Sequence, residues 1–267
     1  MTIVKPLHLV IALLILAVHS PGRSAPGGGK FKDFTLTLGT PQVRYLELQP
    51  IPLVITLKNE TDEPLMGHTV LDFSSGYLQI YVDRGLGPQK IEELSVIQTL
   101  VRTTPREFKP GEEVTTTESL NLKLNKIFSK HGIYKLQARL ISSDGKESVS
   151  SKPIKVEIAE PEGMDAQALE FIRANDEPGY FFAGPQLSEK PEKLQVLENF
   201  VAMFGETAYG NDASFRLGQV HAAKHEYEKA RALFERLSNK FDYAFAGKAA
   251  ENLKRIEREE NKKDRPQ

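Results

Sequence analysis

Two histidines four residues apart, His221 and His225, have the spacing most suggestive of chemistry in this sequence. On a helix, this spacing places both imidazoles on one face, as in many zinc sites. Ala222 follows His221, so the glutamate of the metalloprotease motif is missing. His221 also falls on a predicted apolar stripe, and His225 falls in a predicted turn. We therefore expect no metal site at this pair.

The other residue types that catalyse reactions form no constellation in the sequence. Ser74 and Ser75 precede Gly76 but lack the glycine that begins a nucleophile elbow. The carboxylates of the β-rich region are better explained as solvated strand ends than as an acid–base pair; they are Glu92, Glu93, Glu112, Glu113 and Glu118. No glycine-rich phosphate-binding motif is present. The sequence thus predicts no catalytic residue and no cofactor, and an unrecognised hydrolase is only a minor alternative.

Charge and composition argue against several further classes of protein. The 267 residues include 35 Lys and Arg against 36 Asp and Glu, a formal net charge of -1. A nucleic-acid-binding protein is expected to carry a clear basic excess, so we expect no nucleic-acid partner. The chain has no cysteine, which excludes disulfides, thiolate metal sites and a lipidated N-terminal cysteine.

Residues 1–25 have the features of a secretory signal peptide. Lys5 precedes an apolar run from Leu7 to Val18, and Pro, Gly and small residues follow. The run has about 12 residues, whereas a membrane-spanning helix needs roughly 20. We expect export to the periplasm or the exterior of a bacterial cell and no membrane span after cleavage. Retention of the segment as an anchor is the alternative.

Threonine and alanine divide the rest of the chain into two parts. Residues 30–159 contain 12 Thr and 2 Ala, and residues 160–267 contain 1 Thr and 15 Ala. Thr favours pleated sheet and Ala favours helix. We predict a multidomain β + α protein. Its parts are a flexible spacer (26–30), a β domain (31–159), a linker with a short helix (160–189), a helical domain (190–260) and a disordered tail (261–267).

Alternating apolar residues predict eight or nine short strands in the β domain. Phe34, Leu36 and Leu38 alternate with threonines, and similar segments follow, including Val70–Phe73 and Leu94–Arg102. Turn sequences rich in Pro, Gly and Asp separate them. Period-two alternation with one polar face indicates antiparallel sheets packed face to face, which is a β-sandwich.

A short motif in the β domain resembles immunoglobulin-like domains. Gly132 and Tyr134 form the Gly-x-Tyr sequence that enters the penultimate strand of such domains, where Tyr134 would be the tyrosine-corner residue. Together with earlier Asn-x-Thr-x-x-Pro and Lys-Pro-Gly-Glu motifs, residues 31–159 are similar to bacterial extracytoplasmic modules such as the BsuPI-type proteinase inhibitor domain. The resemblance implies an Ig-like sandwich. It also leaves open an alternative function, a sandwich that binds a protease or a glycan, with the helices as a cap.

Stripes of apolar residues predict four amphipathic helices in residues 190–260. Breaks are expected at Gly205, Gly210, Lys224–His225 and Asp242. Phe204–Gly210 resembles Phe241–Gly247, which begins 37 residues later. A spacing of this size is typical of a repeated helix pair.

Residues 211–242 resemble a tetratricopeptide (TPR) repeat. The matching positions are Leu217, Gly218, Tyr227, Ala230 and Phe234. Four positions depart from the pattern, where Trp, Tyr, Ala and Pro are usual; they are Ser214, His221, Leu237 and Asp242. The resemblance implies that one face of the first helix lines a groove for a protein partner. The residues at that face are Asp212, Phe215, Gln219, Ala222 and Ala223.

The favoured hypothesis is an exported, non-enzymatic adaptor whose helical surface binds a protein of unknown identity. For Phe215, packing on a neighbouring helix or on the sandwich is the alternative. We also predict that a short helix at Met164–Ala174 packs against the region of Leu197 and Phe200, together with Tyr180, Phe181 and Phe182. If these three aromatic residues instead face a second copy of the chain, the protein is a homo-oligomer.

Overall fold

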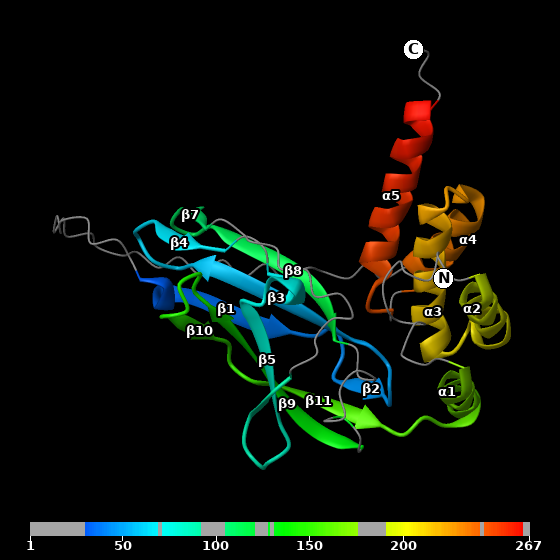
Figure 1. The fold of residues 1–267 in the computed structure, drawn as a ribbon, viewed down its shortest axis with the longest axis horizontal. Helices are drawn as coiled ribbons and strands as arrows, with labels where there is room; N and C mark the ends of the chain where they lie inside the picture. Colours follow the sequence, from blue (N-terminus) through cyan, green and yellow to red (C-terminus); the bar gives the residue numbers. More distant parts are fainter. Residues whose placement is uncertain are drawn as a thin grey trace, which may run out of the picture.

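The computed structural model contains a part built of β-strands followed by a part built of helices (Figure 1). It describes residues 30–68, 71–91, 105–120, 128, 131–175, 191–240 and 243–263. The division confirms the β and α parts that the Thr and Ala distribution predicts. The predicted signal peptide, residues 26–29 of the spacer and the aromatic residues 180–182 lie outside the described residues.

Two β-sheets form the first part. The smaller is antiparallel in the order β1-β3-β8, with β1 at Phe34–Gly39, β3 at Ile51–Asn59 and β8 at Glu113–Leu120. The larger has the order β2-β11-β9-β5-β6, made by Arg44–Leu46, Ile154–Ala159, Gly132–Ile141, Leu78–Asp83 and Gln89–Lys90. Strand β10 (Ser148–Ser150) pairs with β9, and β4 (Leu65–Gly67) pairs with β7 (Arg106–Phe108).

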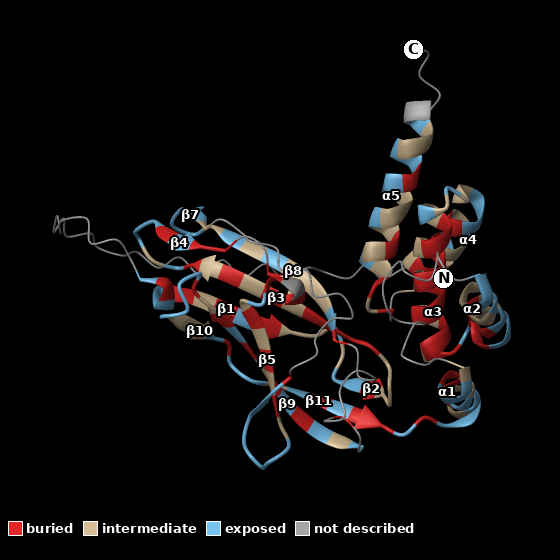
Figure 2. Ribbon diagram, in the orientation of Figure 1, coloured by how far each residue is buried: buried red, intermediate tan, exposed pale blue. Residues whose placement is uncertain are grey.

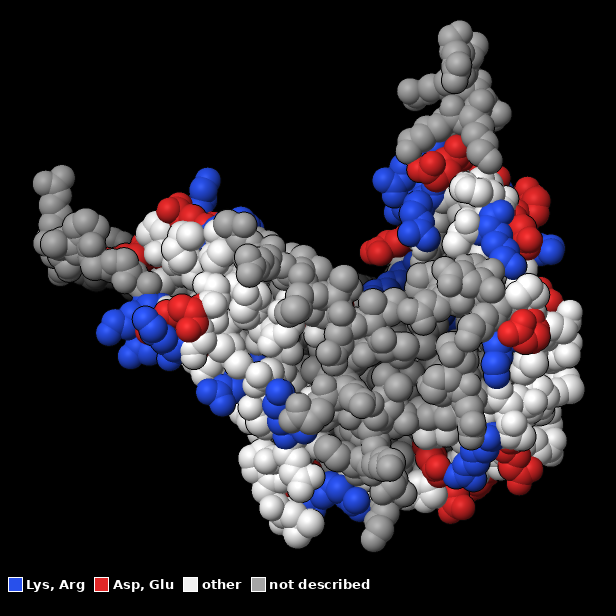
Figure 3. Space-filling view, in the orientation of Figure 1, with Lys and Arg blue, Asp and Glu red and all other residues white. Residues whose placement is uncertain are grey.

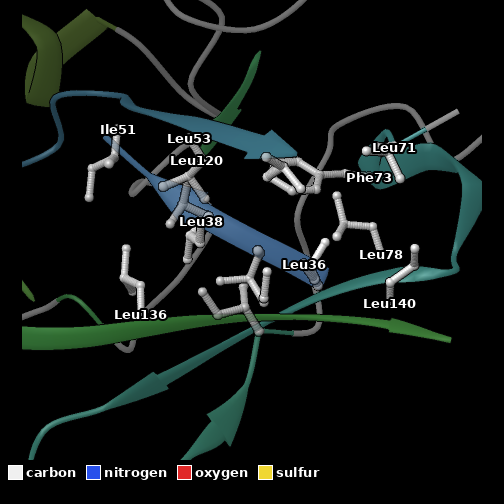
Figure 4. Packing of buried hydrophobic residues seen from close by; sticks show 14 of the residues in the cluster. Leu36, Leu38, Ile51, Leu53, Leu71, Phe73, Leu78, Leu120, Leu136 and Leu140 are labelled. Atoms are coloured by element: carbon white, nitrogen blue, oxygen red, sulfur yellow. The ribbon is translucent and has the colours of Figure 1, made fainter. Parts of the chain in front are cut away.

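The two sheets share one apolar core. Leu36 and Leu38 of β1 lie in the same buried cluster as Leu136 and Leu140 of β9, and Figure 4 shows these side chains between the sheets. The alternation of buried and exposed residues along each strand produces this arrangement, because successive side chains point to opposite faces. Each large apolar side chain so buried stabilises the fold by roughly 1.5–3 kcal/mol.

The β part differs from the sequence-based expectation in two places. Strand β2 pairs with β11 in parallel, with Arg44 opposite Glu157, although only antiparallel pairs were expected. Parallel partners need a long connection, which the rest of the β part supplies here. The expected strand at Val70–Phe73 is also wrong: Leu71 and Asp72 are in no strand and Phe73 begins a 3-10 helix (Phe73–Ser75) capped by Asp72, while Val70 lies outside the described residues. The expected strand Leu94–Arg102 lies outside the described residues.

Five helices follow in the described part of the chain. They are α1 (Gly163–Asn175), α2 (Pro191–Phe204), α3 (Ala208–Ala223), α4 (Tyr227–Ser238) and α5 (Ala246–Lys263). Helices α2 to α5 each pack on the next along the chain. Figure 2 shows buried residues over much of α3 but along one side of α5. Among the described residues, no helix has the length and apolar character needed to cross a membrane.

Two helix boundaries correct the sequence-based expectation. Gly210 does not break a helix, because it lies in the first turn of α3, where its N–H donates to the Thr207 side chain over 2.9 Å. Helix α5 continues to Lys263, three residues into the predicted disordered tail. Residues 257–263 contain neither Gly nor Pro and are rich in Glu, Arg and Lys, which favour helix.

Helix α1 joins the two parts of the molecule. Leu169 and Ile172 are buried, and the ring centroids of Phe171 and Phe200 lie 5.5 Å apart, which confirms the predicted packing of this helix on α2. Leu46 and Leu48 of the β part pack against the same cluster. The β part and the helices are therefore connected by apolar contact as well as by the chain.

Candidate functional site

A groove lies between α3 and α5 and extends from β8 to the C-terminal end of α3. It consists of three adjacent pockets, and Gln219 lines all of them. The pocket nearest the β part has a volume of about 260 Å³ and is called the junction pocket below. Its walls come from β8 and the turn before β3, from α3, and from the start of α5; they include Thr117, Glu118, Asp212, Arg216, Gln219 and Lys248.

The structure brings the five partner-binding residues predicted from the TPR resemblance to this groove. Asp212, Phe215 and Gln219 line the junction pocket. Ala222 and Ala223 line the adjoining pocket of about 440 Å³ toward the end of α3. Helical periodicity explains the result, because Asp212, Phe215, Gln219 and Ala222 follow each other at intervals of three or four residues and Ala223 lies four residues after Gln219.

Phe215 both lines the groove and packs against the neighbouring helices. It is half-buried, and its ring lies 5.7 Å from Phe234 and stacks on Phe245 at 5.7 Å with an angle of 21°. Much of the Phe215 side chain therefore packs on neighbouring helices, as the alternative placement expects. The remaining surface gives the groove an aromatic wall.

Basic side chains from α5 form the opposite wall of the groove, and sequence reasoning missed them. Lys248, Arg255 and Arg258 line it, and Figure 3 shows Lys and Arg side chains on the side of α5 that faces the hollow beside the β part. Their spacing of seven and three residues places them on one face of a helix. That spacing was a usable signal in the sequence.

Arg216 lies at the bottom of the groove and is 8% exposed. Its Nη1 donates a hydrogen bond to Oε1 of Gln219. Its Nε and Nη2 atoms are buried and have no hydrogen-bond partner in the part of the chain that the structure describes. Burial lowers the pKa of the guanidinium to about 10, so Arg216 keeps its charge at neutral pH.

The carboxyl group of Asp212, one helical turn before Arg216, is also buried, and Asp212 is 7% exposed. Burial raises its pKa to about 7, although Tyr243 and Gln49 beside it favour the charged form. Burial likewise raises the pKa of Glu118 to about 7, against the opposing charge of Lys248. Both acids are therefore partly protonated at neutral pH, and the groove is more basic than its residue types suggest.

The raised pKa values predict a specific pH dependence of stability. Between about pH 4 and pH 7, folded Asp212 holds a proton that the unfolded chain has lost. Stability should therefore fall as pH rises through this window and level off above pH 7, by at most about 1.4 kcal/mol per pH unit for each group. Urea unfolding at several pH values would measure this slope. Asp212→Asn should reduce it and Asp212→Asn with Glu118→Gln should reduce it further, whereas an unchanged slope would contradict the assignment.

The residues of the two motifs occupy structural positions. A Cβ atom added at Gly218 would lie 2.8 Å from the ring of Phe234, so glycine permits the close approach of α3 and α4. Tyr134 is fully buried in β9, and Gly132 has a φ of 137°, a backbone conformation that favours glycine. Leu217 and Ala230 are buried and Tyr227 is half-buried. A backbone hydrogen bond from the Tyr134 hydroxyl stays a prediction.

The two histidines with zinc-like spacing have separate neighbours. Nδ1 of His221 lies 2.7 Å from Oε2 of Glu226, and Nδ1 of His225 lies 2.8 Å from the Tyr227 hydroxyl. His225 has a φ of 60°, which belongs to the turn after α3 rather than to the helix. Across the described ranges, no group of three or more His, Cys, Asp or Glu side chains is arranged to hold a metal ion.

Comparison with protein-family models gave no match, and neither did comparison with curated proteins. Among solved structures, a β-glucosidase from Listeria innocua in complex with glucose matches at a TM-score of 0.29 and 15% identity, over 48% of this chain and 16% of that chain. Spo0M, a sporulation control protein from Bacillus subtilis, matches at a TM-score of 0.32 and 13% identity, over 53% of this chain and 55% of that chain. This chain thus spans only a small part of the glucosidase, and neither likeness bears on function.

Proposed function

We propose that the protein is an exported, non-enzymatic adaptor that binds a protein partner in the groove between α3 and α5. The observation that supports this most is the convergence of Asp212, Phe215, Gln219, Ala222 and Ala223 on one groove. In this proposal, α3 and α4 are a TPR-like pair and the β part is an Ig-like module that holds the pair in place. The position of Gly218 against Phe234 and the face-to-face sheets are consistent with both resemblances.

The charges of the groove favour an acidic segment of the partner. Arg255 and Arg258 are exposed along α5, and Lys248 lies nearer the β part. Of the carboxyl groups that oppose them, Asp212 and Glu118 have raised pKa values, whereas Glu251 and Glu259 also line the groove. Although the whole chain has a net charge of -1, this surface would attract negatively charged side chains.

Export is part of the proposal and rests on residues 1–25. Cleavage there would release a protein whose first described residues form a short 3-10 helix (Phe31–Asp33) immediately before β1. Determination of the N-terminal residue of the protein recovered from the periplasm or the medium would test it. A mature protein that retains residues 1–25 would contradict cleavage and favour the anchored alternative.

Site-specific photocrosslinking would test the location of the binding surface. A photoreactive residue at Ala223, on the exposed rim of the groove, should crosslink to a partner in cells. The same residue at Met203, which is 53% exposed on α2, should not. Crosslinks only at Ile133, which is 67% exposed on β9, would contradict the groove and favour a sandwich-centred binder. A crosslink to the same chain would indicate a homo-oligomer.

A charge reversal supplies the matched control for this experiment. Arg255 and Lys254 are neighbouring exposed cations on α5, but only Arg255 lines the groove. Arg255→Glu should reduce the crosslink at Ala223 severalfold because it opposes an acidic segment, and Lys254→Glu should leave it unchanged. Equal loss in both variants would instead indicate a general effect of charge on α5.

A further inference from the structure

Two buried ionisable side chains of opposite type, an acid and a base, lie in the junction pocket without forming an ion pair. Asp212 and Arg216 lie one turn apart on α3 and both line this pocket. The ion pairs of the described residues join neither of them to any other side chain. A buried charge without a partner is costly, so an arrangement of this kind suits a pocket that a ligand fills.

The free atoms of Arg216 define what the ligand must offer. Nη1 is engaged by Gln219, which leaves Nε and Nη2, the two N–H groups along one edge of the planar guanidinium. Two parallel N–H donors in this fork match the two oxygens of a carboxylate. The ligand group at Arg216 is therefore best described as a carboxylate bound through both of its oxygens.

The acceptor beside this fork adds a second requirement. Among the described residues, the buried Oδ2 of Asp212 and the buried Tyr243 hydroxyl in the same pocket make no hydrogen bond of good geometry, although Tyr243 and Gln49 lie close enough to Asp212 to favour its charged form. A ligand that places an N–H donor close to its carboxylate would satisfy Asp212 and Arg216 together. The rings of Phe215 and Phe245 line the rest of the pocket and suit an apolar side chain.

We propose that the junction pocket binds the head group of an α-amino acid, either free or as the C-terminal residue of a peptide. The carboxylate lies on the Nε and Nη2 edge of Arg216, the nitrogen faces Asp212, and an apolar side chain packs on Phe215 and Phe245. A volume of about 260 Å³ is below that of pockets for drug-sized ligands and is appropriate for one residue. This inference does not depend on the adaptor proposal, because small molecules alone test it.

Calorimetric titration of the full chain with four related compounds would test the ligand chemistry. L-phenylalanine and N-acetyl-L-phenylalanine both keep the carboxylate and a nearby N–H donor. Phenylalanine methyl ester and 2-phenylethylamine lack the carboxylate, and we expect them to bind about 10- to 100-fold more weakly. Tighter binding of the free amino acid would identify a free ligand, and tighter binding of the acetylated form would identify a peptide C-terminus. Equal binding of the ester and the acid, or no binding of any compound at millimolar concentration, would overturn the proposal.

Replacement of Arg216 separates a ligand-binding role from a structural one. Arg216→Met removes an unpaired buried charge and keeps an apolar stem, so Tm without ligand should rise or stay the same while affinity falls about 10- to 100-fold. Arg216→Lys keeps the charge but not the fork and should weaken binding similarly. Arg236→Met on α4, where Arg236 contacts Glu206 and Ser214, is the matched control and should bind as the native protein does. Retained affinity in both Arg216 variants would overturn the proposal.

Discussion

Alanine at position 210 should destabilise the protein by about 3 kcal/mol or more, because there is no space for one additional methyl group. A Cβ atom added to Gly210 would lie 1.8 Å from the carbonyl oxygen of Phe204 and 2.8 Å from Cα of Gly205. Both atoms belong to the backbone of the turn between α2 and α3, so no side chain can rotate away. Urea unfolding followed by circular dichroism would measure the loss.

Two other helical glycines provide the matched comparison. Gly247, in the first turn of α5, has no atom within 4 Å of an added Cβ, so Gly247→Ala should stabilise the protein by up to about 1 kcal/mol. Gly218→Ala should change the free energy of unfolding by an amount between those of Gly210→Ala and Gly247→Ala. Its added Cβ meets the ring of Phe234, and this ring can shift slightly. Equal effects at Gly210 and Gly247 would show that helix propensity, rather than the close approach of α2 and α3, decides the outcome.

Gly210 also shows that sequence-based prediction of this fold fails where contacts between helices decide the outcome. Within a short window, glycine lowers helix propensity, so a break was a reasonable expectation. The actual reason for glycine is a contact with Phe204, which depends on how α2 and α3 are joined. Composition and alternation predicted the β and α parts because they depend on local side-chain preferences. The parallel pairing of β2 with β11 was missed because it joins segments far apart in the chain.

The candidate site was likewise predicted only where local periodicity determines it. The face of α3 that carries Phe215 and Gln219 follows from helical periodicity alone, and the basic face of α5 could have been found in the same way. Arg216 could not. It stands between Phe215 and Leu217 like any exposed cation, and only the packing of β8 and α5 over α3 buries it. Long-range burial thus created the most chemically distinctive group in the groove.

Glu47 connects the two parts of the molecule in a way that no local pattern indicates. Its carboxylate lies 2.5 Å from Nη2 of Arg173 in α1 and 2.9 Å from Nε2 of His131, just before β9. Its carbonyl oxygen accepts a hydrogen bond from the buried Tyr209 hydroxyl of α3. Burial alone would raise the pKa of Glu47, but the hydrogen bonds and charges of Arg173 and His131 outweigh it and lower the pKa.

Glu47→Lys should therefore destabilise the contact between the β part and the helices by roughly 2 kcal/mol, since it removes the carboxylate that Arg173 and His131 contact and places a cation beside Arg173. Hydrogen exchange should become faster in α1 and at the start of α3, while the centre of the sheets keeps its protection. A second change, Arg173→Glu, would restore an ion pair of opposite polarity. We expect this double variant to recover part of the lost stability.

Glu235→Lys provides the control, because Glu235 is exposed on α4 and its side chain makes no ion pair within the described ranges. The same change of charge there should alter stability by no more than about 0.5 kcal/mol. If Glu47→Lys also stays within that limit, or if Arg173→Glu adds to its effect instead of offsetting it, apolar packing of Leu46 and Leu48 on the helices holds the two parts together without Glu47. Recovery in the double variant would instead assign the contact to the charges around Glu47, because the apolar residues are the same in every variant compared.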